Sequence, residues 1–230
     1  MFEFRRLTDA ADARYADAIA LYKESFPLHE QRLAESQAAI LKDGAYHFDL
    51  IYDGGEWMGL MLWWEAETFL YVEHFCILPA ARNRGCGGRA LARLAEKGKT
   101  VLLEIDPPVD EISLRREAFY ERCGYRANIH PHVHPPYRAG FPGHELVVMS
   151  RPEKLSHAEY GEFAEYLRER VMGTRRQRRI TKVLRQHRTI ERETAVSKKE
   201  PAEASPSSFG EAQSDCQRRA GSQNEIRKSE

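Results

Sequence analysis

The sequence predicts an α/β (α+β) domain built on a mixed, mostly antiparallel central sheet with helices on its flanks. Three strand candidates, at residues 46–52, 57–65 and 69–78, are joined by short turns, which is typical of an antiparallel meander. The next strand candidate, residues 101–105, follows a glycine-rich turn and a helical stretch. Strand, turn, helix and strand in this order form a βαβ crossover, which requires one parallel pair of strands.

Helical periodicity accounts for most of the remaining residues up to 171. Apolar residues recur at helical spacing over 12–26, where Pro27 ends the helix, and over 30–41, where Asp43 and Gly44 stop it. Further helices are expected at 89–97, 111–122 and 160–171. Short strands are expected at 125–129 and 145–149, joined by a loop rich in proline and histidine.

The composition divides the chain after Gly173. Residues 1–173 carry 21 Lys/Arg and 27 Asp/Glu, whereas residues 174–230 carry 14 and 8. The second part is arginine-rich and then mostly Ser, Glu, Lys, Ala and Gln, so it predicts a disordered tail. We therefore expect one domain at 1–173 and a basic, low-complexity tail at 174–230. A nucleic-acid contact by this tail is the less favoured reading, because no aromatic residues interleave its arginines.

The compartment is predicted from what the sequence lacks. No apolar run reaches the roughly 18–20 residues that a membrane span needs, and the first residues show no apolar stretch of a secretory signal. The four cysteines include no C-x-x-C pair, which indicates reduced thiols. These features predict a cytoplasmic protein without membrane contact. The sequence leaves the oligomeric state open, a homodimer included.

A glycine-rich segment lies between the third strand and the following helix. At such a position free backbone N–H groups and the helix dipole attract an anion, and glycines let it approach the backbone closely. The segment therefore predicts a pyrophosphate cradle, although a turn that merely needs glycine remains the alternative. Its residues are Arg82, Asn83, Arg84, Gly85, Cys86, Gly87 and Gly88.

Two segments resemble signatures of the GCN5-related N-acetyltransferase (GNAT) family. Arg-x-x-Gly-x-Gly at 82–87, after a strand that ends in Ile77-Leu78-Pro79, resembles the family's acyl-CoA pyrophosphate loop. Residues 119–125, Phe-Tyr-Glu-Arg-Cys-Gly-Tyr, resemble its second signature, aromatic-Tyr-x-x-x-Gly-aromatic. A dinucleotide-binding fingerprint fits less well: Glu104 has about the right spacing, but three meander strands precede the loop.

The resemblance implies acetyl-CoA as the acyl donor and assigns roles to several residues. Ile77 and Leu78 would pair with the pantetheine arm, and Phe119 would contact the cofactor. Tyr120 would be the general acid that protonates the departing CoA thiolate. The family often has Asn, a cofactor contact, seven residues before this tyrosine, whereas this sequence has Ser113 there.

The general base is predicted on the third strand. Alternation of side chains places Tyr71, Glu73, Phe75 and Ile77 on one face and His74 on the other. By the same resemblance, Glu73 would accept the amine proton, usually through water, with an exposed strand charge as the alternative reading. His74 is the less favoured base.

The proline- and histidine-rich loop is predicted to face the substrate. Alternate histidines at 130, 132 and 134 would share one face of an extended segment and suit zinc or nickel. The prolines stiffen this loop, and no carboxylate or cysteine is fixed nearby in sequence, so no metal is expected. His134 and Tyr137, together with Tyr71, are predicted to contact the substrate instead.

These features together predict transfer of an acetyl group from acetyl-CoA to a primary amine by direct attack in a ternary complex. The acidic body favours a cationic acceptor, and a small molecule is preferred over a protein. Two alternatives stay open at this point. One is a non-catalytic acyl-CoA-binding module with a basic nucleic-acid-contacting tail, and the other is a redox enzyme that binds a dinucleotide.

Overall fold

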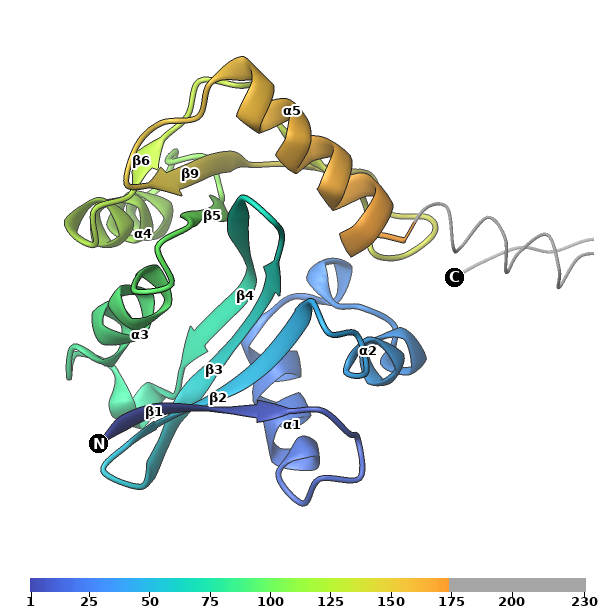
Figure 1. Ribbon diagram of the computed structural model, residues 1–230, viewed down its shortest axis with the longest axis vertical. Coiled ribbons are helices and arrows are strands. Elements are labelled where there is room, and N and C mark those ends of the chain that lie inside the picture. The colour runs from blue at the N-terminus through green and yellow to red at the C-terminus, as the bar shows by residue number, and fades with distance from the viewer. Residues whose placement is uncertain (174–230) are drawn as a thin grey trace, which may run out of the picture. The chain divides into compact units, whose positions relative to one another are not determined.

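The computed structural model describes residues 1–173 and contains a seven-stranded sheet with helices on both faces (Figure 1). The strand order is β1-β2-β3-β4-β5-β9-β6, and a separate two-stranded sheet pairs β7 with β8. Every pair is antiparallel except β4 with β5. The strands are β1 (Phe2–Leu7), β2 (Tyr46–Asp53), β3 (Glu56–Glu65), β4 (Phe69–Ile77), β5 (Thr100–Ile105), β6 (Arg126–Ala127), β7 (Val133–His134), β8 (His144–Glu145) and β9 (Val147–Arg151).

The helices bury two separate apolar cores against this sheet. The helices are α1 (Tyr15–Ser25), α2 (Ala34–Ile40), α3 (Cys86–Ala95), α4 (Glu111–Arg122) and α5 (His157–Tyr166), with short 3-10 turns at Leu28–Glu30 and Pro79–Ala81 and a π-helical turn at Leu167–Val171. Residues of α1 and α5 share one core cluster, and residues of α3 and α4 share the other. In Figure 1, α1, α2 and α5 accordingly lie on one side of the sheet and α3 and α4 on the opposite side.

The structure confirms the predicted fold class, meander and crossover, and it corrects several elements. β1 was not predicted; its residues alternate between partly buried and exposed as they pair with β2 at the edge of the sheet. The helix expected at 30–41 is a 3-10 turn followed by the short α2, and the helix expected at 89–97 begins at Cys86. The predicted histidine-rich loop contains β7, and the strand expected at 145–149 is divided between the end of β8 and the start of β9.

The predictions for residues 174–230 lie outside the described residues. Neither the expected disordered tail nor its contact with nucleic acid is therefore addressed by the fold. Among the helices of residues 1–173, none has the length and apolar character that crossing a membrane requires.

The pairing of β4 positions the site. β4 pairs with β5 only from Phe69 to Val72, whereas its pairing with β3 continues to Ile77. Beyond Val72 the two parallel strands separate, so the β5-facing edge of β4 has no strand partner within residues 1–173. The register against β3 also shifts: Leu62 faces His74 and Trp63 faces Val72, so Glu73 is the extra residue of a β-bulge.

Candidate active site

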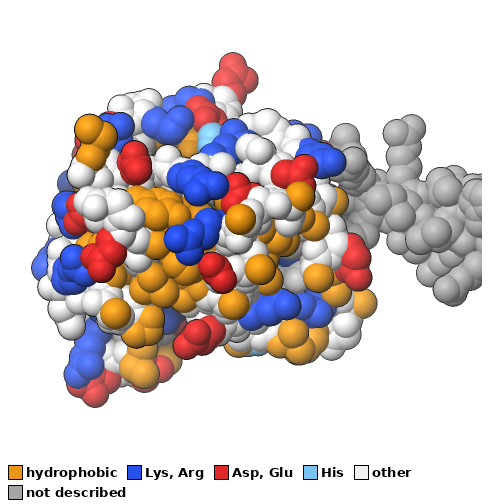
Figure 2. Space-filling model, turned by 90° about the horizontal axis from the view of Figure 1, so that it is seen from below, with side chains coloured by type: hydrophobic (Ala, Val, Ile, Leu, Met, Phe, Trp, Pro, Cys, Tyr) orange, Lys and Arg blue, Asp and Glu red, His pale blue; other side chains and the backbone are white. Residues whose placement is uncertain are grey.

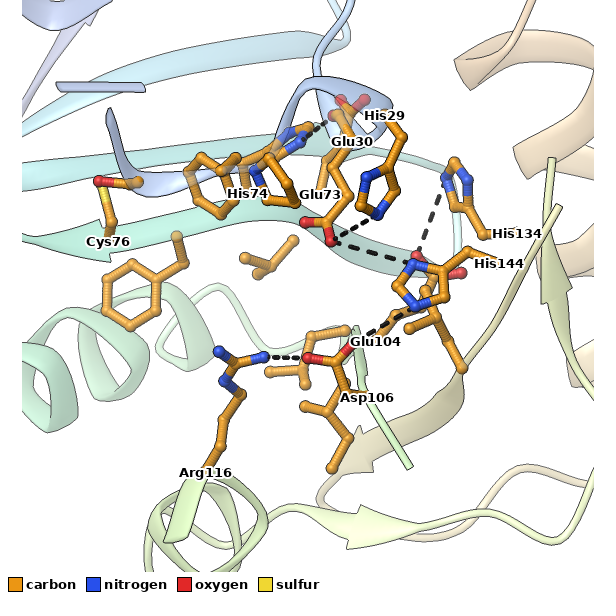
Figure 3. A pocket seen from close by; sticks show the side chains of 18 of the residues that line it. His29, Glu30, Glu73, His74, Cys76, Glu104, Asp106, Arg116, His134 and His144 are labelled. Carbon is orange, nitrogen blue, oxygen red and sulfur yellow. Dashed lines mark hydrogen bonds and ion pairs between the residues drawn. The ribbon is translucent and has the colours of Figure 1, made fainter. Parts of the chain in front are cut away.

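A cavity of about 650 Å³ opens where β4 and β5 diverge (Figure 3). Its walls come from β4, β5, α4, the segment after α1 and the β7–β8 loop. Five carboxylate side chains and two arginines line it, so the cavity is acidic. These charged residues are Glu24, Glu30, Glu73, Glu104, Asp106, Arg82 and Arg116.

The glycine-rich segment reaches this cavity through Arg82. Arg82 is exposed, lines the cavity and donates from Nε to the Ile77 carbonyl at 3.2 Å. Asn83 and Gly85 adopt left-handed backbone conformations, with φ of 62° and 72°, and Gly85 is the N-cap residue of α3. The turn thus ends at the N-terminus of a ten-residue helix, as an anion site requires. Arg84 forms an exposed ion pair with Glu56.

Gly87 has a packing role that the sequence analysis did not anticipate. A Cβ atom built at Gly87 would lie 3.2 Å from Cζ of Phe119 and 3.7 Å from Cζ of Phe75. The absence of a side chain therefore lets α3 pack closely against these rings. Cys86 is buried in the same core cluster, whereas a Cβ at Gly88 would meet only Cys123 Sγ, at 3.8 Å.

Tyr120 lines the cavity, and its ring packs between Phe119 and Tyr125 at centroid distances of 5.1 and 5.8 Å. Burial raises the pKa of its hydroxyl to about 12, so it stays protonated at neutral pH. No residue of the described chain forms a hydrogen bond with this hydroxyl. Tyr120 therefore offers a free donor inside the cavity.

Ser113, where the family often has asparagine, caps α4. Its backbone N–H donates to Asp110 Oδ1 at 2.8 Å, and its hydroxyl accepts from the backbone N–H of Asp110 at 3.0 Å. This reciprocal pair is a capping box, and Ser113 is buried within it. The Ser113 side chain is therefore used to cap the N-terminus of α4.

The side chain of Glu73 is fully buried, and both of its carboxylate oxygens accept hydrogen bonds. Arg32 lies 2.6 Å from Oε1, the Tyr137 hydroxyl donates to the same oxygen at 2.8 Å, and the Trp64 indole donates to Oε2 at 2.7 Å. Burial opposes ionisation, but Arg32 together with the hydrogen bonds from Trp64 and Tyr137 outweighs it, so the pKa of Glu73 is lowered. The carboxylate is therefore held as a fixed negative charge.

The bulge at Glu73 overturns the predicted strand faces. His74 packs against Tyr22 and Phe26 in the region of α1, and Glu73 bonds to Trp64, a member of the same core cluster. Phe75 and Ile77 pack against the other core cluster. The prediction that Glu73 shares a face with Phe75 and Ile77, opposite His74, is therefore wrong, because the extra residue of the bulge interrupts the alternation.

His74 is neutral. Its Nε2 atom lies 2.9 Å from the Glu30 carbonyl, and burial lowers the pKa of its imidazole to about 4. The carbonyl can only accept, so Nε2 carries the hydrogen and Nδ1 is a buried acceptor without a partner among the described residues.

A second buried carboxylate, Glu104, lies at the end of β5. Tyr71 donates to its Oε2 at 2.6 Å, His132 bonds to Oε1, and His134 Nε2 lies 3.9 Å from Oε2. The two histidines lower the pKa of Glu104 against the effect of burial. Tyr71 is itself fully buried and does not line the cavity, which argues against its predicted contact with substrate.

His134 and Tyr137 do line the cavity, as a substrate contact requires. Sequence reasoning missed Arg32, Glu30 and Asp106 as members of the site. Asp106 forms ion pairs with Arg116 and His144, and burial together with Asp106 raises the pKa of Glu30. The sequence did contain a sign of Asp106: acidic residues, Glu104 and Asp106, directly follow the apolar strand residues Val101-Leu102-Leu103.

Comparison with known proteins defines the class. A family model described as the acetyltransferase (GNAT) family matches residues 12–125. A structure from Bacteroides thetaiotaomicron, provisionally named an acetyltransferase of the GNAT family, is 30% identical with a TM-score of 0.70, and the match covers 74% of this chain and 98% of that one. The chain belongs to the GNAT family.

Two further relatives are more limited matches. YjbC of Bacillus subtilis (strain 168), provisionally named an acetyltransferase, is 33% identical over 104 residues, which cover 43% of this chain and 51% of YjbC. The match thus spans about half the length of that relative. A GNAT family acetyltransferase from Elizabethkingia anophelis, solved with acetyl-CoA bound, is 13% identical with a TM-score of 0.44 over 65% of this chain and 96% of its own. At that distance none of its residues can be mapped here.

Proposed function

We propose that this protein transfers an acetyl group from acetyl-CoA to a primary amine in a ternary complex. The observation that carries the proposal is the cavity between β4 and β5, which combines an unpaired strand edge, the loop before α3 and the free hydroxyl of Tyr120. Each feature suits one part of the reaction: the strand edge suits the pantetheine arm, the loop suits the pyrophosphate, and the hydroxyl suits the leaving thiolate.

Donor binding depends on both apolar and basic surface. Figure 2 views the domain from the end where, in Figure 1, the β2–β3 turn and the start of α3 lie. Apolar side chains gather near the centre of this face, and Lys and Arg side chains lie among them. In our proposal the pyrophosphate binds the backbone of residues 82–88 with Arg82. The pantetheine amides pair with the open edge of β4 as far as Ile77 and Leu78.

The acetyl group would then lie near the bulge, where the neutral amine attacks its carbonyl carbon. Backbone N–H groups of the unpaired β4 edge stabilise the developing oxyanion. The tetrahedral intermediate collapses with cleavage of the carbon–sulfur bond, and Tyr120 donates its proton to the thiolate. Solvent returns a proton to Tyr120.

The environment of Glu73 favours a positioning role over that of a direct base. A carboxylate with a lowered pKa and three donors gains little from taking a further proton. We therefore propose that water in the cavity removes the amine proton, and that Glu73, fixed by Arg32, holds Tyr137 in place as part of the wall of the acceptor site.

The cavity also supports a cationic small-molecule acceptor. Arg32 neutralises Glu73 and Arg116 pairs with Asp106, so Glu24, Glu30 and Glu104 remain against Arg82 and leave an excess of negative charge. A volume of about 650 Å³ lies in the range of small-molecule sites. In a thermal-shift screen with CoA present, we expect amines that carry an ammonium group to raise the melting temperature of the protein more than uncharged or anionic compounds do.

The test of catalysis is Tyr120→Phe, with Tyr125→Phe as the matched control. Tyr125 is a neighbouring tyrosine whose buried hydroxyl lacks a partner among the described residues, and it does not line the cavity. Loss of a general acid should lower kcat about 10²-fold or more, with acetyl-CoA affinity unchanged. Equal turnover by Tyr120→Phe and Tyr125→Phe would remove Tyr120 from the mechanism.

A further inference from the structure

Three potential metal ligands converge on one side of the cavity (Figure 3). His29 and Glu30 come from the 3-10 turn after α1, and His144 comes from β8. The Glu30 Oε1 atom lies 3.5 Å from His29 Nε2 and 3.9 Å from His144 Nδ1, and the ligand atoms of all three residues lie within 4.8 Å of one another. This group is called the His29–Glu30–His144 cluster below.

The spacing suits coordination better than hydrogen bonding. Contacts of 3.5 and 3.9 Å are too long for good hydrogen bonds. Ligands at about 2.0–2.2 Å from a tetrahedral zinc ion lie about 3.3–3.6 Å apart. The two separations from Glu30 therefore need to close by at most a few tenths of an ångström, and the two imidazole nitrogens, which lie within 4.8 Å of each other, by up to about 1.5 Å. All three side chains are between 31% and 42% exposed, so a hydrated ion can reach them.

The carboxylate of Asp106 contacts His144 on the side of the ring that faces away from Glu30. Asp106 Oδ1 lies 3.3 Å from His144 Nε2, the ring nitrogen opposite the one that faces Glu30. Asp106 is itself paired with Arg116. A carboxylate that accepts from the outer nitrogen of a histidine fixes the tautomer of the ring and makes its inner nitrogen a better ligand. The cluster thus contains both the ligands and an outer partner of a metal site.

We propose that the His29–Glu30–His144 cluster binds a divalent transition-metal ion, zinc in the first place, with a fourth position open to the cavity. Two imidazoles and one carboxylate form a ligand set of zinc, whereas calcium and magnesium prefer oxygen ligands throughout. This inference departs from the expectation that no metal binds, because His29 and Glu30 are brought to His144 only by the fold.

The site would control access of the acceptor. A divalent ion on Glu30 turns an acidic part of the cavity wall into a cationic one, which repels an ammonium group. Zinc should therefore inhibit acetyl transfer in competition with the amine and leave acetyl-CoA affinity unchanged. This consequence rests on the proposed function, whereas zinc binding itself does not.

The site is tested by competition for zinc between the full chain and a chromophoric chelator. We expect one zinc ion per chain, and His144→Ala and Glu30→Gln should each abolish this binding. His157→Ala, an exposed histidine on α5, is the matched control and should bind as the parent does. Asp106→Asn should weaken binding about tenfold or more. Binding by His144→Ala and Glu30→Gln equal to that of the parent, or no zinc bound at all, would overturn the proposal.

Cobalt substitution and inhibition kinetics separate the remaining alternatives. Bound Co²⁺ should give the absorption of a tetrahedral ion without a thiolate charge-transfer band, since no cysteine belongs to the cluster. A thiolate band would place the ion elsewhere. If amine acetylation is detected, zinc should inhibit the parent and His157→Ala but not His144→Ala. Should no acetylation be found, the zinc titration still decides the site on its own.

Discussion

The buried ion pair between Arg32 and Glu73 gives the sharpest quantitative prediction. The side chains are 6% and 0% exposed, and Arg32 also donates to the Val171 carbonyl at 2.8 Å. Arg32→Met removes the only cation that this carboxylate contacts among the described residues, and it leaves the donors Trp64 and Tyr137 in place. The variant therefore leaves the buried charge uncompensated, and it also loses the hydrogen bond to the Val171 carbonyl.

The expected loss is large. Removing one partner of a buried pair costs about 3–5 kcal/mol. For a domain of this size, that loss corresponds to a fall in Tm of about 6–20 °C. The double variant Arg32→Met with Glu73→Gln removes both charges and should recover a substantial part of the loss, because no buried charge is then left unpaired.

The sign of the pH dependence distinguishes this explanation from simple loss of packing. In the parent, the pKa of Glu73 is lowered, so the pair contributes stability above the ordinary carboxyl pKa of about 4.3 and loses it as pH falls through the lowered folded value. In Arg32→Met, burial without the cation raises the pKa of Glu73. As pH falls through this raised pKa, Glu73 becomes protonated and neutral, so the variant is destabilised less relative to the parent.

The assay is urea unfolding of the full chain between pH 4 and 8, followed by circular dichroism. The difference in unfolding free energy between the parent and Arg32→Met should narrow toward acid pH. A loss below about 1 kcal/mol, or parallel pH curves for the two proteins, would refute the fixed-charge role of Glu73.

Two further predictions concern stability. Asp49 is buried, the Trp63 indole donates to it at 2.7 Å, and burial raises its pKa to about 6. Asp49→Asn should stabilise the protein by about 1–2 kcal/mol at pH 7, because it removes a buried charge. This gain should disappear as pH falls through 6, where Asp49 of the parent becomes protonated. An unfolding free energy at pH 7 that is no higher than the parent's would contradict this prediction. A Cβ at Gly59 would lie 2.2 Å from the Cys76 carbonyl oxygen, so Gly59→Ala should cost about 2 kcal/mol or more, whereas Gly44→Ala, with open space around it, should cost little. Equal melting temperatures for these two variants would contradict the second prediction.

Local signals made much of the fold predictable. The helix at Glu111–Arg122 has the predicted bounds because its start is fixed by Asp110 and its end by Gly124, where φ is 85°. The crossover followed from a glycine-rich turn between two apolar strands. β1 also carried a signal, since Phe2 and Phe4 alternate with Glu3 and Arg5, but a strand exposed on one face has a weak pattern.

The site was less predictable because its contacts join distant segments. The bulge at Glu73 depends on the register with β3, which the periodicity of β4 alone does not contain. Arg32 reaches Glu73 across 41 residues of sequence, and His144 and Glu30 come from segments that meet only in the folded structure. The sequence therefore identified Glu73 as a candidate site residue, but it did not show the hydrogen-bond and ion-pair partners that determine whether Glu73 is protonated.

The central claim, that the loop before α3 and the adjoining cavity bind acetyl-CoA, is tested most directly by calorimetric titration of acetyl-CoA. The variants to compare are Arg82→Glu, in the loop, and Arg93→Glu, on the exposed surface of α3. We predict a single site in the parent, affinity weakened about tenfold or more in Arg82→Glu, and parental affinity in Arg93→Glu. No binding by the parent, or equal binding by both variants, would contradict the assignment.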